Sequence, residues 1–112
     1  TEFERVVLKA LLALRRSFDR RGLDMYLEKP VFDTLTPMGA CRPDIMVEFH
    51  CRSTGECRRV IIEAMDSSDE ATIATKEAAR ASLALIAPVI VVTPSSIEHD
   101  RLEALLRGAI DV

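Results

Sequence analysis

Two acidic side chains, Asp44 and Glu63, occupy positions from which they could act together on a metal ion. Asp44 opens a segment, residues 44–51, in which apolar and polar side chains alternate, as in a half-buried strand. Glu63 lies near the end of a second apolar segment, residues 58–65. Ser53, Thr54 and Gly55 between the two segments are typical of a turn, so the pattern predicts a hairpin with an acid on each strand.

The register of this hairpin decides whether the two carboxylates meet. A register that places Asp44 opposite Glu63 also sets apolar residues against apolar ones and opposite charges face to face, in the pairs Ile45 with Ile62, Val47 with Val60, and Glu48 with Arg59. Facing Cβ atoms then lie roughly 5 Å apart. Two carboxylates so close repel each other unless one is protonated or a cation lies between them, and their oxygens are typical Mg²⁺ ligands. The alternative is that both acids simply flank the strand ends in water.

The rest of the chain predicts the elements that must position these acids. Apolar residues recur at three- and four-residue spacing over residues 2–18 and predict an amphipathic helix. Residues 24–32 predict a strand before a turn-rich segment, residues 34–41, and the alanine-rich residues 69–86 predict a helix capped by Ser67, Ser68 or Asp69. Residues 89–93 predict a buried strand, and Ser95 with Glu98 predicts a capping box that opens a last helix, ending near Gly108. The expected order is αβββαβα, in an α/β fold with a mixed central sheet flanked by helices.

The composition limits the class of protein to which the chain can belong. The 112 residues are 48% hydrophobic and 29% charged, which predicts one globular domain over residues 1–112. No apolar run approaches the roughly 18 residues of a membrane span, so we expect no membrane partner. Three cysteines cannot form a closed set of disulfides, which favours a reducing, cytoplasmic location. Because the chain begins at Thr1, we expect a processed chain or a domain excised from a larger protein.

Several residues, taken in their order along the chain, carry a family resemblance. Glu4 on the first predicted helix, Pro43-Asp44 at a strand start and Glu63-Ala64-Met65 after the hairpin are followed by a helix and a strand. This arrangement resembles the PD-(D/E)XK nuclease superfamily, which has the restriction-endonuclease-like fold, and the resemblance covers the whole chain. It implies hydrolysis of phosphodiester bonds with Mg²⁺ or Mn²⁺ held by Asp44 and Glu63, with Glu4 as the carboxylate that some members add on the first helix.

The sequence departs from this family pattern at one position. The superfamily has a lysine two residues after the second acid, where it stabilises charge or orients water, but here that position is Met65. A thioether can neither carry positive charge nor donate a hydrogen bond. Some members relocate the lysine to the following helix, and Met65 followed by a helix lysine is also similar to a plasmid-associated branch of the superfamily. Lys76 is the last of the three lysines, so we predict that it is the relocated cation. The alternative is an exposed lysine paired on its own helix.

Two other features have a structural and a functional interpretation. His50, Cys51 and Cys57 bracket the hairpin turn and suggest zinc, with Cys41 as a fourth ligand, but no CxxC-type spacing supports a structural site. Residues 1–59 carry 11 basic and 9 acidic residues, against 4 and 9 in residues 60–112, although the whole chain has a net charge of −3. The basic half could contact phosphate oxygens, or its arginines could complement a solvated helix end.

We therefore carry two hypotheses for the function. The first is a Mg²⁺-dependent nuclease domain acting on nucleic acid, DNA in the first instance, with Asp44, Glu63 and Lys76 as its catalytic residues. The second is a degenerate, non-catalytic member of the fold that serves as a nucleic-acid-binding or assembly module, which Met65 favours. The sequence has no glycine-rich phosphate loop and no Gly-x-Ser-x-Gly or His-Glu-x-x-His motif. A chain this short leaves little surface for recognition, so we expect a homodimer or a larger parent protein to supply specificity.

Overall fold

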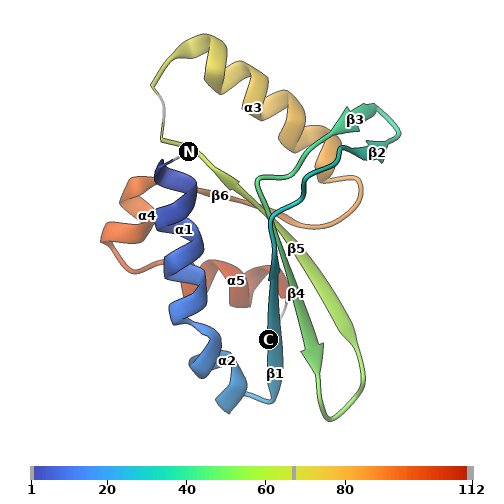
Figure 1. Ribbon diagram of the computed structural model, residues 1–112, viewed down its shortest axis with the longest axis vertical. Coiled ribbons are helices and arrows are strands. Elements are labelled where there is room, and N and C mark those ends of the chain that lie inside the picture. The colour runs from blue at the N-terminus through green and yellow to red at the C-terminus, as the bar shows by residue number, and fades with distance from the viewer. Residues whose placement is uncertain (1, 67, 111–112) are drawn as a thin grey trace.

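A mixed four-stranded sheet organises the chain (Figure 1). The computed structural model describes residues 2–66 and 68–110. The elements are α1 (Glu2–Ala13), α2 (Arg15–Arg20), β1 (Leu23–Glu28), β2 (Thr34–Thr36), β3 (Gly39–Cys41), β4 (Ile45–Cys51), β5 (Cys57–Ala64), α3 (Glu70–Leu83), β6 (Val89–Val92), α4 (Pro94–Glu98) and α5 (Leu102–Ile110). The expected α/β fold with a mixed, helix-flanked sheet is confirmed.

The sheet runs in the order β1-β4-β5-β6. The pairs β1 with β4 and β4 with β5 are antiparallel, because each is made by a reversal of the chain. β6 lies parallel to β5, and the crossover between them contains α3. A parallel pair needs such a crossover, which carries α3 across the end of β5, beside the small β2–β3 hairpin (Figure 1). This crossover brings a helix to the strand end that carries Glu63.

One face of the sheet carries the main hydrophobic core. Alternate residues of β4, Ile45, Val47 and Phe49, are buried on this face. They belong to one cluster with apolar residues of α1, α2 and α5, which cover the face. Phe18 of α2 packs on Phe49 with ring centroids 4.8 Å apart. The opposite face is covered by α3 only toward the end of β5, where Ile61 and Glu63 are buried.

The predicted register of the central hairpin is correct. Ile45 pairs with Ile62, Val47 with Val60, and Glu48 with Arg59. Asp44 directly precedes β4, so its register position is opposite Glu63. Residues 44, 46, 48 and 50 therefore share the face opposite the main core, because side chains alternate along a strand.

The first predicted helix begins as expected, but it is interrupted, and its second part ends at Arg20, two residues later than predicted. Leu14 separates α1 from α2, and its amide donates to Leu11 O at 3.0 Å, a tighter turn than an α-helix has. Gly22 follows α2 with φ +81°, a conformation that suits glycine and turns the chain into β1. The strand predicted over residues 24–32 ends at Glu28. The turn-rich segment that follows forms the separate β2–β3 hairpin.

The last helix differs from the prediction in its cap and in an interruption. Thr93 caps the helix in place of Ser95: its hydroxyl accepts from the Ser96 amide, the Ser96 hydroxyl accepts from the Thr93 amide, and Pro94 takes the first helical position. Glu98 has no part in this capping box. Asp100, at φ 52°, then separates α4 from α5.

The helix that carries Lys76 begins as predicted. The Asp69 side chain caps α3 by accepting from the Thr72 amide at 2.9 Å. Of the other two cap candidates, Ser67 lies outside the described residues. α3 ends at Leu83, three residues before the predicted end. Within the described ranges, no helix is long and apolar enough to cross a membrane.

Candidate metal and phosphodiester site

Asp44 lies where the chain enters β4, and a backbone contact fixes its side chain. Its Oδ2 accepts a hydrogen bond of 2.9 Å from the Ala64 amide at the end of β5. This bond joins the start of β4 to the end of β5, the strand that carries Glu63, and it holds the Asp44 carboxylate in place there. Asp44 is half-buried, with 15% of its side chain exposed. The two predicted acids are thus brought together by the sheet itself.

Lys76 reaches back from α3 to both acids. Its Nζ lies 2.7 Å from Asp44 Oδ2 and 3.8 Å from Glu63 Oε2. Lys76 stands seven residues after the Asp69 cap, two turns into the helix, so its long side chain spans the space between α3 and the strand ends. The alternative of a lysine that points to solvent and pairs only on its own helix does not describe this structure.

Glu63 is the most deeply buried member of the group, with 3% of its side chain exposed. Burial raises the pKa of its carboxyl to about 8, and the neighbouring charge of Asp44 and a hydrogen bond to the Asp44 side chain act in the same direction. Lys76 opposes this shift but does not cancel it. Glu63 Oε1 is buried and has no hydrogen-bond partner among the described residues.

Opposing influences also act on Lys76. Burial alone would lower the pKa of its ammonium, but the hydrogen bond to Asp44 and the charges of Asp44, Glu63 and Glu4 outweigh it, and the pKa is raised. Lys76 is therefore a fixed positive charge at neutral pH. It carries the charge that Met65 lacks.

Glu4 lies at the edge of this group, on the first turn of α1. Its Oε1 lies 3.2 Å from the Nζ of Lys29. The negative charge of Glu4 contributes to the raised pKa of Lys76. The structure thus brings Glu4 close enough to influence the group electrostatically, while Asp44, Glu63 and Lys76 form its centre.

A pocket of about 400 Å³ opens beside the three central residues. Asp44, Glu63 and Lys76 line it together with Arg42 and, from α3, Ala71, Thr72, Thr75 and Ala79. Arg42 brings a second cation, although it also pairs with Asp33 at 3.2 Å. From the sequence, Arg42 was only one of the basic residues of the first half. Its place two residues before Asp44 was the available signal, because the same chain segment leads into β4.

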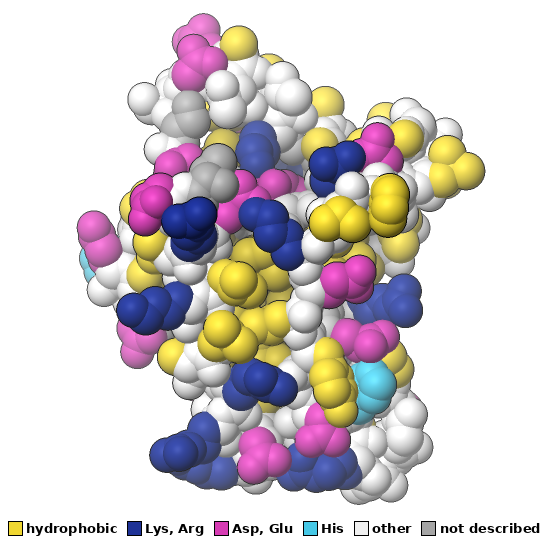
Figure 2. All heavy atoms as spheres, viewed as in Figure 1, with side chains coloured by type: hydrophobic (Ala, Val, Ile, Leu, Met, Phe, Trp, Pro, Cys, Tyr) yellow, Lys and Arg dark blue, Asp and Glu magenta, His cyan; other side chains and the backbone are white. Residues whose placement is uncertain are grey.

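Several basic residues of the first half are paired with acids. Acids neutralise four of the arginines: Arg42 by Asp33, Arg52 by Asp19 and Asp24, Arg58 by Glu56, and Arg59 by Glu48. On the face shown in Figure 2, dark blue and magenta side chains are interspersed. These local ion pairs therefore offset part of the positive charge of the first half.

The comparisons with known proteins decide the family. Residues 1–109 match the family described as a restriction endonuclease-like C-terminal domain. The chain belongs to this family. The predicted membership of the restriction-endonuclease-like nuclease superfamily is thereby confirmed. Neither the curated proteins nor the solved structures gave a match.

Within this restriction endonuclease-like domain, Met65 does not line the pocket beside Asp44, Glu63 and Lys76. Its amide donates to Val92 O at 2.8 Å, which continues the pairing of β5 with β6. Met65 lines a second pocket, of about 250 Å³, together with Glu63 and Lys76 and with Ile73, Glu77, Arg80 and Val91. Positions 65 and 76 therefore border the same space around Glu63, and a cation at either position would lie near the same carboxylate.

The acid group of this domain fits a hard divalent cation. Carboxylate oxygens are the ligands that Mg²⁺ and Mn²⁺ prefer, and Asp44 and Glu63 supply them from adjacent strands. The buried Glu63 Oε1, without a partner in the described part of the chain, is an acceptor that a cation would satisfy. Lys76 now supplies the positive charge that two facing carboxylates require.

The raised pKa of Glu63 predicts a pH-dependent stability. A carboxyl with a folded pKa of about 8 and an ordinary value of 4.5 contributes stability that is fully present below pH 4.5 and is lost as the pH rises toward 8. Glu63→Gln has no such proton to lose. In a metal chelator, the free energy of unfolding of the wild type should therefore fall relative to Glu63→Gln by at least about 1.4 kcal/mol between these limits, the equivalent of one pKa unit.

Urea unfolding of the wild type and Glu63→Gln at about pH 5, 6.5 and 8 measures this difference. Glu70→Gln, on the exposed first turn of α3, is the matched control and should follow the wild type at each pH. A difference between Glu63→Gln and the wild type that does not change with pH would show that Glu63 ionises normally.

Proposed function

We propose that this domain hydrolyses phosphodiester bonds in nucleic acid, with Mg²⁺ or Mn²⁺ held by Asp44 and Glu63. The observation that carries the proposal is the meeting of two carboxylates and an ammonium at one pocket, with Lys76 Nζ 2.7 Å from Asp44. Membership of the restriction endonuclease-like family supports the same reaction class. DNA is the proposed substrate, because it is the substrate that the family description implies most directly.

Each residue has a proposed role. Asp44 and Glu63 are the metal ligands, with Glu4 as a further carboxylate from α1. A divalent cation at these acids supplies polarisation of the phosphate and a lowered pKa for a bound water. Lys76 stabilises the negative charge that develops on the phosphate or orients the attacking water, which are tasks for a fixed positive charge. Arg42, at the same pocket, positions a neighbouring phosphate.

Glu63 must also release a proton to act as a ligand. Its pKa of about 8 keeps the carboxyl largely neutral at neutral pH while Lys76 is the nearby cation. A divalent charge favours the ionised form more strongly than a monovalent one does, and Lys76 Nζ lies 3.8 Å from Glu63. A divalent cation held by these acids would therefore displace the Glu63 proton to solvent and would compete with Lys76 for Asp44.

Partners and location belong to the same proposal. The family description of a C-terminal domain supports a larger parent protein, which would supply the specificity that a short chain lacks. A homodimer would serve the same purpose. The free thiols of Cys41, Cys51 and Cys57 support a reducing compartment, the cytoplasm.

A second candidate function is a non-catalytic module that binds nucleic acid or assists assembly. Met65, in the family's lysine position, favours it, and so does the internal neutralisation of Asp44 by Lys76 at 2.7 Å. A decayed site would keep this ion pair as a structural contact and would not bind a metal. The two candidates therefore differ in metal binding.

Calorimetric titration of the chain with Mn²⁺ separates the two candidates. The nuclease proposal predicts a binding event that disappears in Asp44→Asn and in Glu63→Gln but persists in Glu70→Gln. The measurement is made at about pH 8, near the pKa of Glu63, where its proton opposes binding less than at neutral pH. Absence of binding to the wild type would favour the degenerate module and count against the nuclease.

A further inference from the structure

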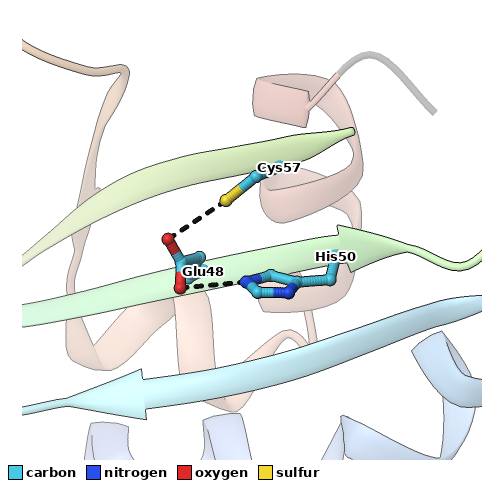
Figure 3. A group of neighbouring side chains, drawn as sticks. All are labelled: Glu48, His50 and Cys57. Carbon is cyan, nitrogen blue, oxygen red and sulfur yellow. Dashed lines mark hydrogen bonds and ion pairs between the residues drawn. The ribbon is translucent and has the colours of Figure 1, made fainter. Parts of the chain in front are cut away.

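A second group of potential metal ligands lies on the open face of the sheet, apart from the acid pocket (Figure 3). Glu48 and His50 are alternate residues of β4, and Cys57 of β5 faces His50 in the register. Because side chains alternate along a strand, all three lie on the same face as Asp44. Glu48 is four residues from Asp44, roughly 13 Å along an extended chain, so the two groups share no side chain.

The three side chains already point toward one another. The Nε2 of His50 lies 3.0 Å from one oxygen of Glu48, and the Cys57 thiol donates to the other oxygen at 3.0 Å. One donor atom from each side chain lies within 4.8 Å of the other two. Ligand atoms around a tetrahedral Zn²⁺ must lie a few ångströms apart, so small side-chain rotations would bring these three to a common centre.

Neighbouring residues already hold two of the donors in place. The ring of Tyr26, from β1, lies against the His50 imidazole with centroids 4.9 Å apart. Arg59 Nε lies 3.1 Å from Glu48 Oε1, which leaves Oε2 toward His50. Contacts from Cys57, His50 and Arg59 thus converge on the two oxygens of the Glu48 carboxylate. A metal ligand is commonly held by such outer contacts.

The donor set selects the kind of metal. Sulfur and imidazole nitrogen suit borderline or soft ions such as Zn²⁺, whereas Mg²⁺ prefers oxygen ligands alone. We propose that Glu48, His50 and Cys57 bind Zn²⁺, with the remaining coordination position open on the exposed sheet face. Binding replaces the Cys57 thiol proton, which passes to solvent, by a zinc–thiolate bond.

This ligand set differs from the one considered from the sequence. Cys51 lies on the opposite face of β4, packs at the edge of the core and contacts Ser53 Oγ at 3.3 Å. Cys41 lies at the end of β3, in the separate two-stranded sheet. Glu48, which the sequence analysis assigned only to a pair with Arg59, takes the place of Cys51.

Titration with Co²⁺, a coloured substitute for Zn²⁺, tests the site through its sulfur ligand. The purified chain, reduced with a phosphine and free of chelator, should bind Co²⁺ with a near-ultraviolet thiolate-to-cobalt absorption band, and Zn²⁺ should displace the band. Cys57→Ser should abolish the band. His50→Ala should weaken binding at least roughly tenfold, because even outer-shell substitutions cost that much at metal sites.

Two controls assign the band to this group. Cys51→Ser removes a thiol from the same hairpin but from the opposite face, and it should keep the full band. Asp44→Asn in the acid pocket should keep it too, which separates this site from the proposed nuclease centre. Absence of the band in the wild type, its survival in Cys57→Ser, or its loss in Cys51→Ser would overturn the proposal. Because His50 and Cys57 are exposed, their substitution should leave the fold intact, and circular dichroism checks this.

Discussion

Asp44→Asn and Glu63→Gln should each lower metal-dependent cleavage of DNA by at least about 100-fold. Each substitution keeps the size of the side chain and removes one charged metal ligand, and substitutions even beyond the ligand shell of a metal site cost 10- to 100-fold. Glu63→Gln also leaves a neutral group at a position that is 3% exposed, so it should not disturb packing. The expected losses therefore reflect chemistry and not unfolding.

The measurement follows conversion of supercoiled plasmid by the wild type and variants with Mg²⁺, with Mn²⁺ and with a chelator. Glu70→Gln, which replaces an exposed carboxylate on α3, should cleave at the wild-type rate. Equal residual cleavage in Asp44→Asn and Glu63→Gln, if it matches the wild type, would mean that a contaminating nuclease is responsible. A wild type without cleavage that still binds DNA would support the non-catalytic module.

Lys76→Met should lower cleavage by about 10²- to 10³-fold, the typical cost of removing one group that stabilises developing charge. Lys76 Nζ is 2.7 Å from Asp44 and 3.8 Å from Glu63, so its loss removes the cation nearest to both acids. Metal binding should survive or even tighten, because the ammonium no longer competes for Asp44. A loss of rate with retained Mn²⁺ affinity is therefore the expected signature.

The double variant Met65→Lys/Lys76→Met tests whether the two positions are equivalent. Both residues border the same pocket beside Glu63, and lysine and methionine are unbranched side chains of similar length. Returning the cation to position 65 should recover at least about tenfold of the activity lost in Lys76→Met, a gain of about 1.4 kcal/mol in the barrier.

Lys9→Met is the control for the loss of a lysine, because Lys9 is exposed on α1 and lies outside the acid group. It should cleave as the wild type does. If Lys76→Met also cleaved at the wild-type rate, Lys76 would be only the structural partner of Asp44, and the relocation of the lysine would be disproved.

Much of the central hairpin is predictable from sequence because its information is local. The alternation of residues 45–51 and the opposite charges of Glu48 and Arg59 select one register, and a shift by one residue would place charged groups in the core. That register alone sets Asp44 beside Glu63. The Asp69 cap of α3 is predictable for the same reason, since capping depends on residues three positions apart.

Other details depend on competing local signals. Thr93 and Ser95 are both good caps, and Pro94, which is favoured at the first helical position, gives the advantage to Thr93. The periodicity of residues 2–18 continues through Leu14, so it does not reveal the break between α1 and α2. The turn residues within 34–41 predicted only a turn-rich segment, so the pairing of the short strands β2 and β3 on either side of them was not predicted.

The amino-acid sequence by itself predicted that two carboxylates face each other at the end of a hairpin, and it places Met65 two residues after the second of them. Only the tertiary structure shows that the Lys76 ammonium contacts both carboxylates and that Glu63 is buried. Both facts depend on how α3 packs across the end of β5, and that packing joins residues distant in the chain. For Glu48, His50 and Cys57, the predicted register already places His50 opposite Cys57 and on the same face as Glu48. Only the structure shows that the three side chains turn toward one another.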